Sequence, residues 1–158
     1  MSYCKLSANP VGHAVLEVSG EFDADLTAAD ALCTALQLLN HLQDVRSDYV
    51  KRQRIYVPQE WMAQVGLSEK VLEKSETGPK LRVVFHQWLD EVDVLLREAG
   101  HLPKTIHHRG VRWELRIILA FARGLARKLR KNDPMARHVK LGSFHRILLA
   151  VGAIIGVC

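Results

Sequence analysis

Four polar side chains within residues 37–48 have the types and the spacing needed to bind a metal-bridged diphosphate. Gln37, Asn40, Asp44 and Asp48 follow one another at intervals of three, four and four residues, which places them on one face of an α-helix. Mg²⁺ prefers oxygen ligands and often takes only one or two protein carboxylates together with phosphate and water. We therefore predict Asp44, Asp48 and Asn40 as Mg²⁺ ligands, with Gln37 completing a catalytic face by orienting substrate or water.

A basic cluster follows this face directly. Arg54 could hold a diphosphate through its planar fork of donors, and Lys51 and Arg52 are further candidate substrate-binding residues. The pattern also has an alternative explanation, because a solvated amphipathic helix commonly carries acids and amides on its outer face and cations at its C-terminal end. Spacing alone leaves both interpretations open.

The polar face requires a helix, which the sequence predicts over residues 27–49. Thr27, with Asp30 three residues later, is similar to a capping box at the start of that helix. The apolar residues of the segment fall mostly on the side opposite the polar face: Leu32, Ala35, Leu38, Leu39, Leu42 and Val45. One helix is therefore expected to carry a core-facing side and a carboxylate-amide side.

The remaining apolar periodicity is also helical. Two amphipathic helices are predicted at residues 81–99 and 109–131, a short helix at residues 61–65, and a helix N-cap at Ser68. No strand pattern of convincing length occurs. The sequence therefore predicts an all-α fold.

Both ends of the chain carry features that affect this helical prediction. Pro10 predicts two helical pieces bent at residues 9–12, because proline lacks an amide donor and clashes with the preceding turn. The apolar residues 147–158 number only twelve, whereas a membrane-spanning helix needs about 20. We interpret them as a last core helix, or as a core helix left without its normal partners.

Two segments resemble the squalene/phytoene synthase family, the head-to-head prenyl-diphosphate condensing enzymes. They are YCKLSANPVG, at residues 3–12, and QxxNxxxDxxxD followed by RIYVP, at residues 37–58. The SANPVG and ALCTALQLLN runs are most similar to the hopanoid-pathway branch, which includes bacterial hydroxysqualene synthases. The resemblance implies an all-helical isoprenoid-synthase bundle, Mg²⁺ as cofactor, and farnesyl or presqualene diphosphate as substrate. It also implies that a hydrophobic substrate channel is lined by Tyr3, Ser7, Val11 and Gly12.

The resemblance covers only the later half or so of such an enzyme. The first aspartate-rich motif of the family should lie before Tyr3, so we expect residues 1–158 to form a single partial domain. A truncated product, an internal-start fragment and a remnant are the alternatives. The full-length relative would convert presqualene diphosphate to hydroxysqualene, and the residues leave squalene-type and phytoene-type products open. Uncovered apolar helix faces would favour self-association.

Composition supplies the rival interpretation. The formal net charge is +5, and basic residues are concentrated in residues 109–146. A non-catalytic remnant could therefore act as a basic helical module that binds a lipid surface or a protein. No nucleic-acid-binding signature occurs, so no nucleic-acid partner is predicted.

The spacing of the cysteines and the absence of common catalytic motifs limit the expected cellular location and class of enzyme. The three cysteines are widely separated and lack zinc-site spacing, which favours a reducing, cytoplasmic location. The basic region is compatible with peripheral contact at the inner face of the membrane. P-loop, GxSxG and HExxH patterns do not occur, so the classes of enzyme that use them are not indicated.

Overall fold

The computed structural model describes residues 2–143, and helices are the only regular elements in that part of the chain. The helices of the N-terminal half are α1 (Ser2–Ser7), α2 (Asn9–Val18), α3 (Leu26–Arg52) and α4 (Gln59–Gln64). A 3₁₀ turn follows at Glu69–Glu73, and then α5 (Pro79–Ala99), α6 (Leu102–Thr105) and α7 (Arg109–Lys131). The all-α prediction is confirmed.

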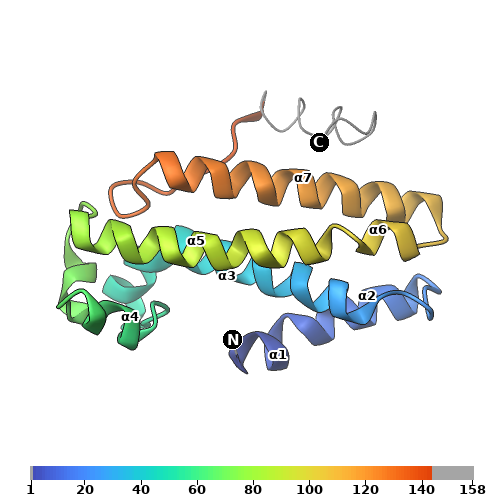
Figure 1. The fold of residues 1–158 in the computed structure, drawn as a ribbon, viewed down its shortest axis with the longest axis horizontal. Coiled ribbons are helices and arrows are strands. Elements are labelled where there is room, and N and C mark those ends of the chain that lie inside the picture. The colour runs from blue at the N-terminus through green and yellow to red at the C-terminus, as the bar shows by residue number, and fades with distance from the viewer. Residues whose placement is uncertain (1, 144–158) are drawn as a thin grey trace.

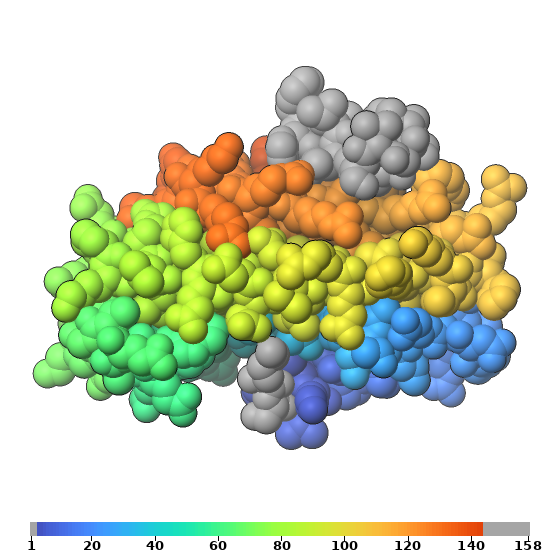
Figure 2. Space-filling model, in the orientation of Figure 1, coloured from blue at the N-terminus to red at the C-terminus, as the bar shows by residue number. Residues whose placement is uncertain are grey.

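Helix α3 lies at the centre of the arrangement. It packs against α5 and α7 on one side and against α1 and α2 on another, and the long helices α3, α5 and α7 run lengthwise through the molecule (Figure 1). Figure 2 shows α5 crossing the visible face between α7 and the segments that contain α1, α2 and α4. The three long helices therefore form the frame that holds the shorter ones.

The hydrophobic core joins these three helices. Leu39, Leu42 and Val45 of α3 are almost completely buried, and they belong to the same apolar cluster as residues of α5 and α7. The predicted apolar face of α3 is confirmed, with Leu38 only partly buried at its margin. Burial of this face fixes the rotation of α3 about its axis, so the opposite polar face is presented outward.

The boundaries of α3 differ from the prediction at both ends. Asp25, and not Thr27, caps the helix, because its side chain accepts a hydrogen bond from the Ala28 amide. The helix also continues to Arg52 and ends at Gln53, which has a left-handed backbone with φ of 55°. This left-handed residue turns the chain back beside the last turn of α3.

The N-terminal bend lies slightly earlier than predicted. Helices α1 and α2 meet at Ala8, and Pro10 lies in the first turn of α2. Proline is tolerated there because the first amides of a helix have no intrahelical acceptor. Pro10 therefore starts the second helix and does not kink it.

The other elements follow the prediction with one exception. The short helix predicted at residues 61–65 is α4, and α7 spans the predicted range from Arg109 to Lys131. Ser68 occupies the N-cap position that was predicted, but it makes no side-chain cap and the element that follows is a short 3₁₀ helix. The last core helix predicted at residues 147–158 lies outside the described residues.

Candidate functional site

The polar face of α3 places the four predicted residues along about three turns of one helix. Gln37, Asp44 and Asp48 are partly buried, and Asn40 is exposed. Asp48 is the more enclosed carboxylate, with 14% of its side chain exposed compared with 38% for Asp44. The face thus offers acidic oxygens that are held in place and still reachable from solvent.

Asp48 is the centre of a hydrogen-bonded group formed where the chain turns back after α3. Its carboxylate accepts hydrogen bonds from the Tyr56 hydroxyl at 2.6 Å and from Arg52 at 3.0 Å. The Arg54 guanidinium lies beside the Tyr56 hydroxyl, and both residues line one hollow. Burial, together with the bond to Asp48, raises the pKa of Tyr56, so its hydroxyl keeps the proton it donates. The turn at Gln53 therefore brings a cation and a phenol to the carboxylate.

His41 also belongs to this group, although no motif in the sequence selects it. Its ring stacks on Tyr56 with a centroid separation of 3.9 Å and an interplanar angle of 3°. Its Nε2 lies 2.7 Å from the Gln37 amide nitrogen. Burial lowers the pKa of His41, against the opposing effect of the Asp48 and Asp44 carboxylates. A neutral imidazole can accept the amide proton of Gln37, which orients that side chain.

Asp44 has a looser environment. His138 Nδ1, in the segment that follows α7, lies 3.3 Å from Asp44 Oδ1. Lys51 and Arg52 lie on the exposed last turn of α3, and Arg54 is also exposed. Arg46, on the same helix, points away from the site and donates to the Lys74 carbonyl.

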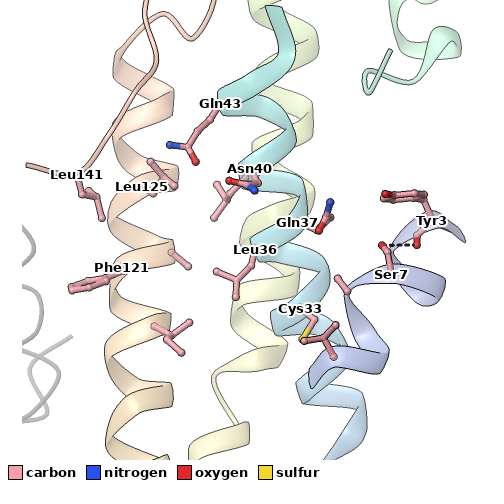
Figure 3. Close-up of a pocket in the computed structure, with 15 residues that line it drawn as sticks. Tyr3, Ser7, Cys33, Leu36, Gln37, Asn40, Gln43, Phe121, Leu125 and Leu141 are labelled. Carbon is pink, nitrogen blue, oxygen red and sulfur yellow. Dashed lines mark hydrogen bonds between the residues drawn. The ribbon is translucent and has the colours of Figure 1, made fainter. Parts of the chain in front are cut away.

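An apolar groove begins beside this polar group. It has a volume of about 660 Å³, and its floor is α3, with α1 and α2 on one side and α7 on the other (Figure 3). Tyr3, Ser7 and Val11 line it together with Gln37 and Asn40. In Figure 3 Gln37 lies toward Tyr3, while Gln43 extends toward the α7 side, where it bonds to the Val139 carbonyl. Gly12 lies in an adjoining smaller hollow.

The oxygen donors of this face suit a Mg²⁺ ion that also binds phosphate and water, and they are too few for a metal bound only by protein side chains. Asp44, Asp48 and Asn40 supply hard oxygen donors from one helix face, and Mg²⁺ usually completes its shell with phosphate and water. Among residues 2–143, no group of three or more His, Cys, Asp or Glu side chains is placed to hold a metal by itself. The site therefore suits a cation that arrives with a phosphorylated ligand.

Several basic residues of α7 form ion pairs or hydrogen bonds with other segments of the chain. Arg130 contacts Asp90 and Asp93 of α5 at 2.7 and 2.6 Å. Arg112 donates to the Ile106 carbonyl and Arg123 to the Leu96 carbonyl. The ion pairs of Arg130 offset part of the positive charge that could bind a membrane surface, whereas Arg112 and Arg123 bond to neutral carbonyls and keep their charge. No described helix is both long enough and apolar enough to cross a membrane.

Comparison with known proteins identifies the family of this chain. Residues 1–145 match the profile of the squalene/phytoene synthase family. This chain belongs to that family. Hydroxysqualene synthase of Zymomonas mobilis is 35% identical over 156 residues, which cover 99% of this chain, and that of Sinorhizobium fredii is 33% identical over 153 residues, covering 97%. In both cases the match covers 52% of the relative.

A solved structure of the family has the same fold. Squalene synthase HpnC from Alicyclobacillus acidocaldarius superposes with a TM-score of 0.76 at 28% identity, over 82% of this chain and 49% of that one. The predicted isoprenoid-synthase fold is thus confirmed. The chain spans about half the length of the relatives that it matches.

Proposed function

We propose that this chain carries one side of a Mg²⁺-dependent prenyl-diphosphate site. Its family and its hydroxysqualene synthase relatives place it in isoprenoid biosynthesis. The observation that carries the finer proposal is that Asp44 and Asp48 continue the α3 face whose Gln37 and Asn40 line the apolar groove. Arg54 lines a neighbouring hollow, which shares Tyr3 with the groove. A prenyl diphosphate has the matching distribution of charge, with a dianionic or trianionic head and a hydrocarbon tail.

The residues of the chain have separable roles in this proposal. Mg²⁺, when bound, would neutralise the charge that develops on the departing diphosphate. Asp44, Asp48 and Asn40 would hold it, and Arg54 would bind phosphate oxygens. Tyr56 and Arg52 hold the Asp48 carboxylate in orientation. Lys51, on the exposed last turn of α3, would supply further positive charge near the diphosphate.

The groove serves the remainder of the substrate. Apolar walls exclude water from the prenyl chain, and Gln37 and Asn40 stand at the boundary between these walls and the polar group. The names of the relatives favour hydroxysqualene as product. In that reaction the C–O bond of presqualene diphosphate breaks, diphosphate leaves with the electron pair, and water adds to the carbocation and loses a proton.

The catalytic unit in this proposal includes the half of the relatives' length that this chain does not span. Helix α2 exposes Val11, Val15 and Val18 on adjacent turns, and Phe22 beyond them is 78% exposed. Exposed apolar stripes of this kind are usually covered by a partner. We assign the covering surface to the remaining half of the family domain, which would also carry the first aspartate-rich motif.

Ligand binding by the full chain tests the proposal. Calorimetric titration with farnesyl thiodiphosphate should show binding in Mg²⁺ that is lost in EDTA. The variant Asp44→Ala/Asp48→Ala should weaken it at least about tenfold, or 1.4 kcal/mol. The variant Asp23→Ala/Glu60→Ala removes two exposed carboxylates elsewhere and should bind normally. Binding that ignores Mg²⁺, or that survives in the first variant, would refute the site.

The rival function makes a different prediction. A basic surface module would co-sediment with anionic liposomes, release them at high salt, and show no Mg²⁺-dependent ligand binding. The ion pairs of Arg130 with Asp90 and Asp93 argue against that outcome, because they offset part of the basic charge of α7.

A further inference from the structure

The groove continues into a second hollow on the far side of a contact between α2 and α3. The second hollow has a volume of about 220 Å³ and is lined by apolar side chains apart from Glu114. Four residues line both spaces: Val11, Cys33, Leu36 and Ile118. The two hollows therefore adjoin, and these four residues form the division between them.

The division is tight at Gly12 and Cys33. A Cβ atom added to Gly12 would lie 2.5 Å from Cys33 Sγ, which is closer than non-bonded atoms approach. The sulfur thus occupies the space that a side chain at position 12 would need. Burial raises the pKa of Cys33, so the group at the division is a neutral thiol compatible with a hydrocarbon neighbour.

The path from the groove to this second hollow leads away from the acidic face. With a rise of about 1.5 Å per residue, Cys33 lies about 16 Å along α3 from Asp44, and Ala29, in the second hollow, about 22 Å. A ligand held by its diphosphate at Asp44 and Asp48 would meet the wide hollow first. Only a longer hydrocarbon chain would reach the division.

We propose that the contact between Gly12 and Cys33 sets how far a prenyl chain extends along this path, and so selects substrates by chain length. The inference rests on the proposed function, since it takes the diphosphate end to lie at the acidic face. Cys33 and Gly12 act here as specificity-determining residues and take no part in bond breaking.

The test compares geranyl, farnesyl and geranylgeranyl thiodiphosphates bound to the full chain in Mg²⁺. Cys33→Ala should raise the affinity for geranylgeranyl relative to farnesyl thiodiphosphate about tenfold, and Cys33→Leu should lower that ratio about tenfold. Geranyl thiodiphosphate should bind all variants equally. Val18→Ala, which removes methyl groups from a side chain that is 90% exposed, should leave the ratio unchanged.

A second pair of variants tests the same inference if Cys33→Leu does not fold. Gly12→Ala should push the Cys33 sulfur into the path and lower the same ratio. Adding Cys33→Ala should restore the ratio, because removal of the sulfur leaves only Cβ, which lies 4.0 Å from the new methyl group at position 12. Melting curves confirm that each variant is folded.

The outcomes separate the two proposals. Unchanged ratios in both folded pairs, with Mg²⁺-dependent binding intact, would overturn the chain-length inference and leave the diphosphate site standing. Shifted ratios without any Mg²⁺ dependence would support the inference and overturn the proposed metal site. Failure of all three ligands to bind would overturn both.

Discussion

The carboxylates at the two ends of α3 have very different surroundings. Glu21, in the loop that precedes the helix, has only 2% of its side chain exposed and accepts the backbone amides of His107 and His108 at 2.9 and 2.6 Å. Asp48, near the other end, is held by the side chains of Tyr56 and Arg52. Backbone donors are fixed by the fold, whereas side-chain donors can turn toward a ligand. A carboxylate satisfied by the backbone is structural, and one held by side chains remains available for binding.

Glu21 should matter most for stability. Glu21→Gln places an amide NH₂ against one of two backbone N–H donors, so a buried donor is left unsatisfied. We expect the melting temperature to fall by about 5–10 °C, as measured by circular dichroism. Glu17→Gln, an exposed neutralisation on α2, should change it little. An equal fall in melting temperature in both variants would show that Glu21 is no more important for stability than an exposed carboxylate.

Acid titration gives an independent view of the same carboxylate. The His107 and His108 amides lower the pKa of Glu21. Its stabilising contribution is therefore complete above the unfolded-state pKa of about 4.3 and is lost as the pH falls through the lower folded value. Wild-type protein should lose stability below about pH 4.3 more steeply than Glu21→Gln. Parallel melting-temperature curves would show that Glu21 is not responsible.

Neutralising the acidic face should affect binding more than folding. Asp44→Asn/Asp48→Asn should change the free energy of unfolding by no more than about 1 kcal/mol, measured by urea denaturation. The affinity for Mg²⁺ and inorganic diphosphate should nevertheless fall at least about tenfold. A large loss of stability would make these residues structural, like Glu21.

The smallest effect is expected for a substitution at Gln53, in the turn after α3. Gln53 has a left-handed backbone, a conformation that glycine adopts at little steric cost. Gln53→Gly should stabilise the chain by about 0.5–1 kcal/mol in urea denaturation. If Tyr56 and Arg54 need only this turn to reach Asp48, diphosphate affinity should be unchanged. Weaker affinity would show that the rigidity of Gln53 also matters.

The sequence predicts the helices better than it predicts the contacts among site residues. Both ends of α7 agree with the prediction, because apolar periodicity and the Asn132-Asp133-Pro134 stop are local signals. The motif likewise selects Asp44 and Asp48 from local spacing. These features need no information from distant parts of the chain.

The roles of His41 and Tyr56 could not be obtained in the same way. Their stacking depends on the left-handed turn at Gln53, and glutamine carries no strong signal for that conformation. The contact of Asp44 with His138 joins residues from separate segments, and so does the clamp between Glu21 and His107. Such contacts follow from packing of the helices, which spacing along one helix does not specify.

We propose that the acidic face of α3 binds a divalent cation together with diphosphate, and paramagnetic NMR tests this most directly. Mn²⁺ can replace Mg²⁺ as a paramagnetic probe in NMR spectra of the full chain with inorganic diphosphate. We predict broadening centred on Asn40, Asp44, Asp48 and Tyr56, dependent on diphosphate and absent around Glu21. Broadening centred elsewhere, or none with diphosphate present, would contradict the account.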